Sequence, residues 1–226
     1  GTTATTIANG VNMTIAASIV AGKTISDGTD SGTVTITALH STLGADLSGV
    51  DASTVTAAFD GNGTFTGNLG TAVVTVADNV SLTGAANKLV SHTINKSGTG
   101  ADNGAIVVTL NAAADTGVNL TQLTGSAGIT SITAAESFTF AGTLHGTVAT
   151  TVADSVTFTT TALKATGKAI SDGDDTATVA ITALHSDLDA DLSGIDANTV
   201  TAAFDDNGTF TGDLGTAVVT VANDKT

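Results

Sequence analysis

Aspartates are the residues of this chain whose type and spacing suit a chemical role. Carboxylates recur at every second residue from Asp187 to Asp191, and others crowd the turn around Gly173. Oxygen ligands close together on a loop suit Ca²⁺, a hard cation that takes about six to eight oxygens. Two interpretations stay open: these carboxylates bind calcium, or they are solvated turn residues. The calcium candidates are Asp27, Asp30, Asp172, Asp174, Asp175, Asp187, Asp189 and Asp191.

No other pattern indicates catalysis or a transition metal. His40 and His185 stand in two Ala-Leu-His-Ser phrases, and neither a His-x-His nor a His-Glu-x-x-His spacing occurs. A zinc site is therefore not predicted, and both residues are interpreted as loop histidines. The nucleophile elbow Gly-x-Ser-x-Gly is also missing from the sequence. We predict that the chain is not an enzyme, with no catalytic residue and no cofactor besides calcium.

One stretch of sequence occurs twice. Residues 25–79 and residues 170–224 are nearly identical and align without a gap. A fainter repeat lies inside, because the phrase that starts at Thr75 resembles those that start at Thr6 and Thr151. Self-similarity at this scale is typical of structural arrays. We predict three modules: A (residues 1–74), a divergent B (residues 75–149) and A′ (residues 150–226).

Comparison of the two copies also tests whether the candidate calcium ligands recur. Asp187 and Asp189 are replaced by Thr42 and Gly44 in the first copy, and no EF-hand loop is present. The solvated interpretation therefore stays beside the calcium interpretation.

Short alternations of apolar and polar residues recur along the chain, for example at 33–37 and 177–181. A period of two with β-branched residues predicts strands. Clusters such as Asp60-Gly61-Asn62-Gly63 lie between them and predict turns. Helical periodicity is limited to a turn or two near residues 39–47 and 184–192. The sequence therefore predicts an all-β fold.

Two all-β architectures compete. In a β-solenoid, successive coils of backbone stack and bury one continuous core. The alternative is a string of small Ig-like β-sandwiches, which are usually near 100 residues long with a large aromatic core residue. The modules are shorter than that, aromatic residues are only 3% of the chain, and no linker separates the modules. We predict a repetitive, β-helix-like solenoid.

The composition of the chain excludes some classes of binding partner. The formal net charge is −15, with six Lys and no Arg, so nucleic-acid binding is not expected, since it needs clustered cations. No apolar run reaches the length of about 18 residues that a membrane helix needs, so no membrane insertion is predicted. The chain begins with Gly1 rather than Met and shows no signal peptide. We interpret it as a processed or excised piece of an array.

Threonine phrases suggest a binding surface. In Thr35-Ile36-Thr37 and Thr157-Phe158-Thr159 the apolar middle residue would point inward and both hydroxyls outward. Such rows on a solenoid are similar to the surfaces of ice-binding proteins. The phrases look scattered rather than one per coil, so a displayed module for ice or carbohydrate is an alternative function.

Several phrases carry a family resemblance. Thr-Val-Ala-Asp-Asn-Val-Ser-Leu-Thr at 75–83 and Gly-Thr-Phe-Thr-Gly-Asn-Leu-Gly at 63–70 resemble repeats of very large bacterial surface proteins. These are S-layer-like and giant adhesin-like "β-strand repeat" proteins. The resemblance implies export without a cleaved N-terminal signal and a place outside the cell or on its surface. It implies a role in a surface lattice, fibre or adhesin, and maps no functional residues.

We therefore expect an extracellular structural repeat protein that acts by self-assembly. Its expected partners are copies of itself, in head-to-tail or lateral contact, and surface glycans.

Overall fold

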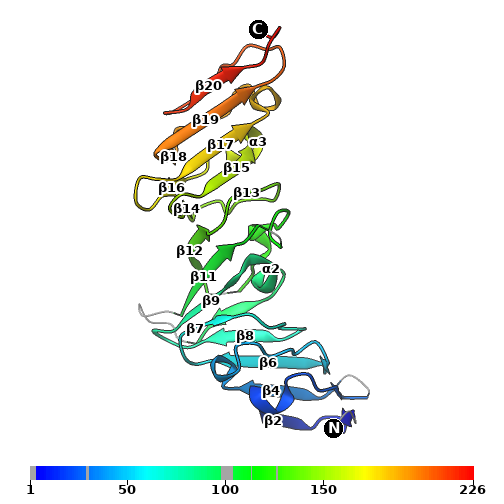
Figure 1. Ribbon diagram of the computed structural model, residues 1–226. Coiled ribbons are helices and arrows are strands. Elements are labelled where there is room, and N and C mark those ends of the chain that lie inside the picture. Colours follow the sequence, from blue (N-terminus) through cyan, green and yellow to red (C-terminus); the bar gives the residue numbers. More distant parts are fainter. Residues whose placement is uncertain (1–3, 29–30, 98–103, 113, 126) are drawn as a thin grey trace. The chain divides into compact units, whose positions relative to one another are not determined.

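The computed structural model describes residues 4–28, 31–97, 104–112, 114–125 and 127–226. Parallel strands stack as a β-solenoid of about 10 turns with few helices (Figure 1). The predicted solenoid is confirmed. The sandwich alternative is wrong, because sandwiches are built from antiparallel sheets. Within the described ranges, no helix has both the length and the apolar character needed to cross a bilayer.

The chain divides into two compact units. The first contains Gly1–Val107 and Gln122–Thr130, and the second contains Val108–Thr121 and Ser131–Thr226. Each unit is described by itself below.

The first unit contains two sheets and a strand pair. The parallel orders are β1-β3-β5, β2-β4-β6-β8-β10 and β7-β9. Its elements are β1 (Thr5–Thr6), β2 (Asn12–Ala16), α1 (Ala17–Val20), β3 (Ile25–Ser26), β4 (Thr33–Thr37), η1 (Leu39–Ser41), β5 (Val50–Asp51), β6 (Thr54–Phe59), β7 (Gly63–Phe65), β8 (Val73–Val76), β9 (Ser81–Ala85), α2 (Ala86–Leu89) and β10 (Ile94–Lys96). Residues of both units occur in β11 (Ala105–Leu110), η2 (Leu120–Gln122) and β12 (Ile129–Ala134).

The second unit repeats this plan. Its parallel strands pair in the orders β12-β14-β16-β18 and β13-β15-β17-β19-β20. Its further elements are β13 (Phe138–Thr139), β14 (Thr150–Val152), β15 (Thr157–Thr161), α3 (Ala162–Ala165), β16 (Ile170–Asp172), β17 (Thr178–Thr182), η3 (Leu184–Ser186), β18 (Ile195–Asp196), β19 (Thr199–Phe204) and β20 (Val218–Val221).

The strands have this form because their sequences alternate. In β4, Val34 and Ile36 are fully buried while the three threonines are only half-buried. Successive side chains of a strand point to opposite faces, so one face of every coil fills the interior. The bulkiest packing lies in the second unit, where the rings of Phe138 and Phe158 meet edge to face with centroids 5.7 Å apart. Val, Ile, Leu and Ala fill most of the remaining core, and Phe59 and Phe65 are fully buried in the first unit.

The predicted helical turns are partly right. The 3-10 helices η1 and η3 lie at the expected sites, while the one-turn helices α1, α2 and α3 were not predicted.

The strands change sheet at the start of each new module. By sequence β8 corresponds to β1, yet β1 lies in the sheet of β3 and β5 while β8 extends the sheet of β6. The step between paired residues shortens at this point: Thr35 pairs with Thr56, but Thr56 pairs with Val73. In the second unit, β20 likewise extends the sheet of β19 while its counterpart β14 lies beside β16. Within each unit, the strand that opens the second module therefore extends a different sheet from the strand that opens the first.

Candidate functional site

The first pair of predicted calcium ligands joins neighbouring coils. The Oδ2 atom of Asp27 accepts hydrogen bonds from the backbone N–H of Gly32 (3.0 Å) and of Ser53 (2.7 Å), and Asp27 is buried. Its counterpart Asp172 accepts from Ala177 (3.3 Å) and Asn198 (2.8 Å) in the same way. These carboxylates compensate backbone donors that would otherwise lack a partner, which is a structural role.

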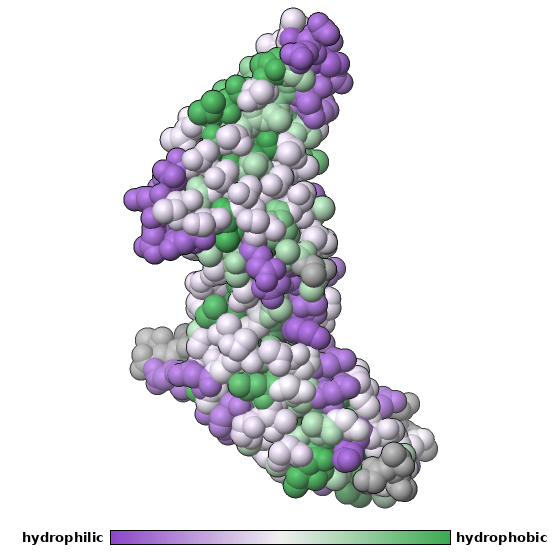
Figure 2. All heavy atoms as spheres, viewed as in Figure 1, coloured by the Kyte–Doolittle hydropathy of each residue, from purple (hydrophilic) through white to green (hydrophobic). Residues whose placement is uncertain are grey.

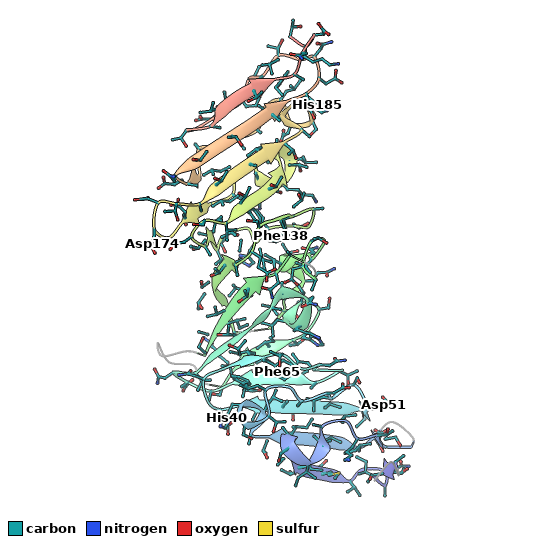
Figure 3. The ribbon with its side chains drawn as sticks, viewed as in Figure 1. His40, Asp51, Phe65, Phe138, Asp174 and His185 are labelled. Carbon is teal, nitrogen blue, oxygen red and sulfur yellow. The ribbon has the colours of Figure 1, made fainter. Side chains whose placement is uncertain are left out.

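Of the next four candidates, the three that the structure describes are exposed. Asp30 lies outside the described residues. Asp174 and Asp175 are exposed, with Asp174 on a loop away from the strands (Figure 3). Asp191 accepts hydrogen bonds from the backbone N–H (3.0 Å) and hydroxyl (2.6 Å) of Ser193. These bonds favour the ionised carboxylate and lower the pKa of Asp191.

Asp187 and Asp189 are the two candidates whose side chains interact. Burial raises the pKa of Asp187, and the hydrogen bond and negative charge of Asp189 raise it further. Two carboxylates are a small part of the oxygens that calcium needs. In the parts of the chain that the structure describes, no group of three or more His, Cys, Asp or Glu residues is arranged to hold a metal. Calcium binding stays a prediction.

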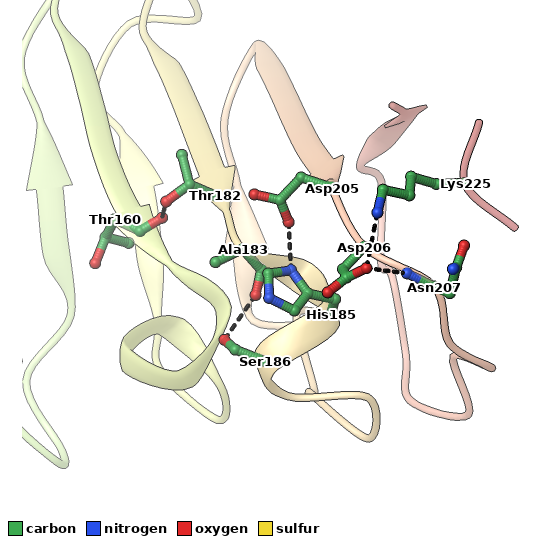
Figure 4. A network of polar contacts seen from close by, with 9 residues as sticks. All are labelled: Thr160, Thr182, Ala183, His185, Ser186, Asp205, Asp206, Asn207 and Lys225. Carbon is green, nitrogen blue, oxygen red and sulfur yellow. Dashed lines mark hydrogen bonds and ion pairs between the residues drawn. The ribbon is translucent and has the colours of Figure 1, made fainter. Parts of the chain in front are cut away.

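The two repeated histidines contact aspartates of the neighbouring coil. His40 Nδ1 contacts Asp60 Oδ1, and His185 Nδ1 contacts Asp205 Oδ1 (Figure 4). The sequence analysis interpreted both histidines as loop residues and did not predict these contacts. The available signal was that both partners recur in both copies, one coil after their histidine.

The second copy carries a further ion pair. Lys225 Nζ lies 3.0 Å from Asp206 Oδ1 (Figure 4), and this contact is the main reason that the pKa of Asp206 is lowered. The pair is exposed, so we expect it to contribute little to stability.

The last coil of the second unit exposes core residues. In the first copy Phe65, Leu69, Val74 and Val76 are all buried, at most 1% exposed. Of their counterparts, Val221 is 51% exposed. The other three counterparts are only half-buried: Phe210, Leu214 and Val219. Apolar atoms gather over β20 in Figure 2.

The two copies differ because, among the described residues, a further coil packs on the first copy only. There β9 pairs with β7, so that Gly63 lies opposite Leu82 and Phe65 opposite Gly84. In the second copy the counterpart of β7, residues 208–210, forms no strand. A cavity of about 210 Å³ opens here. It is lined by Leu184, Phe204, Gly208, Phe210, Leu214, Val219, Val221 and Thr226. We call this surface the open end.

The first coil of the first unit is uncovered in a complementary way. Met13 and Ile15 in β2 are half-buried, and Val11 before them is 45% exposed. The residues that correspond to Met13 are Leu82 and Phe158, both fully buried. Core-type side chains are therefore accessible at this coil as well.

We compared the chain with known protein families, curated proteins and solved structures. No family model, no curated protein and no solved structure matches the chain.

Proposed function

We propose that this chain is a non-enzymatic structural repeat protein of a bacterial surface layer, filament or giant adhesin, acting outside the cell by assembling with copies of itself. The observation that carries the proposal is the open end. The same residues that are buried under a coil in the first copy are accessible in the second. A coil of the chain's own type is the cover that fits them, whether it comes from another copy or from a continuation of the same chain.

The contact we propose is head to tail. The open end of one molecule would pack against the first coil of the next, around Met13 and Ile15. The open end and the first coil suit each other chemically, since each presents apolar side chains from parallel strands. A head-to-tail contact that does not close on itself produces a filament.

The expected strength of one contact is modest. Full burial of a large apolar side chain contributes about 1.5–3 kcal/mol. Phe210, Leu214, Val219 and Val221 are already partly buried, so they contribute less than this each. Association costs about 4–15 kcal/mol in lost translational and rotational freedom. We therefore expect assembly that depends on concentration and gains from added strand pairing at residues 208–210.

The test uses two variants that each block one end. Val219→Asp places a charge in the open end, and Met13→Asp places one in the first coil. We expect the native chain to sediment as a concentration-dependent series of oligomers and each variant alone to stay monomeric. Mixed, the two variants retain one intact head and one intact tail, so they should form a dimer and no larger species.

The matched control is Thr220→Asp, which adds the same charge next to Val219 on an exposed residue. It should assemble as the native chain does. A native chain that stays monomeric at every concentration would overturn the proposal. Repeating the series with calcium and with a chelator tests whether the predicted cation takes part.

A further inference from the structure

The outward faces of two sheets carry threonines in register. In the first unit Thr14 pairs with Thr35, and Thr35 with Thr56. The complete array there is Thr14, Thr33, Thr35, Thr37, Thr54 and Thr56. The phrases Thr35-Ile36-Thr37 and Thr157-Phe158-Thr159 lie in different sheets, so they stay scattered as predicted. The sequence analysis did not predict that further threonines of neighbouring coils stand beside each phrase, which happens because a coil is close to a constant length within a module.

The second unit repeats the array independently. Thr157 pairs with Thr178, and Thr178 with Thr199. The complete array is Thr157, Thr159, Thr161, Thr178, Thr182, Thr199 and Thr201. We call the two surfaces the threonine arrays.

The hydroxyls of these arrays are largely available to solvent water. Thr56 Oγ1 donates to Thr35 Oγ1 at 3.5 Å, a weak contact, and Thr182 Oγ1 donates to the Thr160 carbonyl at 3.3 Å. The other array hydroxyls make no hydrogen bond to a described residue. Each threonine also presents a methyl group, so the surface alternates hydrogen-bonding and apolar points.

The arrays carry no charge although the chain has a net charge of −15. None of the strands that form them contains Asp, Glu, Lys or His. No aromatic ring of these strands is exposed on the arrays, since Phe59, Phe158 and Phe204 point into the core and are buried. A charged partner has nothing to pair with here, and a sugar has no ring to stack on.

The spacing matches ordered water. Paired strands lie about 4.8 Å apart and alternate residues of one strand about 6.6 Å apart. These distances are close to the repeats between water oxygens on the faces of hexagonal ice. Fixing one water costs up to about 2 kcal/mol, but that cost is small where the water is about to join a crystal. Many weak contacts on a regular array then add together.

We propose that the threonine arrays bind the surface of ice. The inference is independent of self-assembly, because each array lies within a single unit of one chain. The ligand is the crystalline lattice of water. The array hydroxyls form hydrogen bonds with it, and the methyl groups lie between the hydroxyls.

The test measures how much protein a slowly growing ice front takes up, with inhibition of ice recrystallisation as a second readout. The double variant Thr35→Lys and Thr178→Lys places one long cation at the centre of each array. The matched control is the double variant Thr71→Lys and Thr216→Lys. Thr71 and Thr216 are exposed and lie outside the strands.

We expect the native chain to be enriched in ice, the control to match it, and the array variant to be excluded like an ordinary soluble protein. Thermal unfolding shows whether both variants keep their fold. Exclusion of the native chain from ice would overturn the proposal, as would equal uptake of the array variant. Running the series in the Val219→Asp background separates ice binding from assembly: a loss there alone would show that assembled chains are needed, which also contradicts an array that acts within one unit.

Discussion

At the scale of single residues, the two copies act as a natural mutant series. Asp187 and Asp189 stand where the first copy has Thr42 and Gly44, and the local backbone is the same, with a 3-10 helix just before in each. Differences in local stability between the two copies can therefore be assigned to these side chains. The pair of carboxylates adds an unfavourable interaction that the first copy lacks.

This difference predicts a pH dependence. The pKa of Asp187 is raised in the folded chain, so the folded state binds a proton more readily than the unfolded state. Ionisation therefore costs stability above the folded pKa, and the cost disappears below the usual value of 3.8. We expect Asp187→Thr to raise the melting temperature at pH 7 by an amount that corresponds to less than about 1 kcal/mol, because the pair is partly solvated.

Melting curves between pH 7 and pH 3 would check this. The gain should shrink as the pH falls. Asp174→Thr, at an exposed residue whose counterpart in the first copy is Thr29, should show no such trend. A gain that grows toward acid would contradict the assignment.

Residue roles were the least predictable part of the candidate site. The sequence shows which aspartates recur, yet it does not distinguish a carboxylate that accepts backbone N–H groups from one that faces solvent. Asp27 and Asp172 look like ligands in sequence and are structural acceptors in space. One donor of each lies five residues along the chain, while the other, Ser53 or Asn198, lies one coil away at a distance that depends on the exact coil length.

At the scale of elements, the corners of the coil impose the strictest sequence requirement. Gly67, Gly142 and Gly212 are equivalent corner residues, and a Cβ at any of them would collide with a backbone carbonyl of the coil below. For Gly142 that carbonyl belongs to Val118. The neighbouring coil is held by strand pairing and cannot move aside at little cost.

We therefore predict that Gly142→Ala destabilises the fold by about 1–3 kcal/mol, the usual cost of overpacking. The matched control is Gly146→Ala, four residues along the chain, where a Cβ would meet nothing within 4 Å. Urea unfolding of both variants gives the comparison. Equal midpoints for the two would show that the corner can relax.

The strands themselves were predictable and their partners were not. Alternation in a stretch such as β4 specifies which residues face inward, since the period of a strand is two. The pairing of Thr35 with Thr14 on one side and Thr56 on the other depends instead on the number of residues in each coil. The short phrase repeats were visible in the sequence, but coil length was not, and the threonine arrays were not predicted for this reason.

At the scale of the whole molecule, charge opposes association. The net charge is −15 and the isoelectric point is about 4.1, so copies repel one another at neutral pH. The open end itself is apolar apart from Thr226. Attraction at the contact and repulsion over the whole surface therefore respond differently to salt.

We predict that assembly strengthens when sodium chloride is raised from about 10 mM to about 150 mM, where the screening length falls from about 30 Å to about 8 Å. Sedimentation velocity at fixed protein concentration would measure it. The Met13→Asp variant should remain monomeric at both salt concentrations. Weaker assembly in salt would indicate that ion pairs, rather than apolar burial, hold the copies together.

The change of sheet at each module start has a consequence for how such a protein evolves. Because β8 extends the sheet of β6 and β20 that of β19, a gene that gains or loses one repeat alters more than length. Within a unit, the strand that opens the following module then extends a different sheet, together with the side chains that it displays. Unequal recombination between near-identical copies could thereby redirect a binding surface in a single step, without one point mutation.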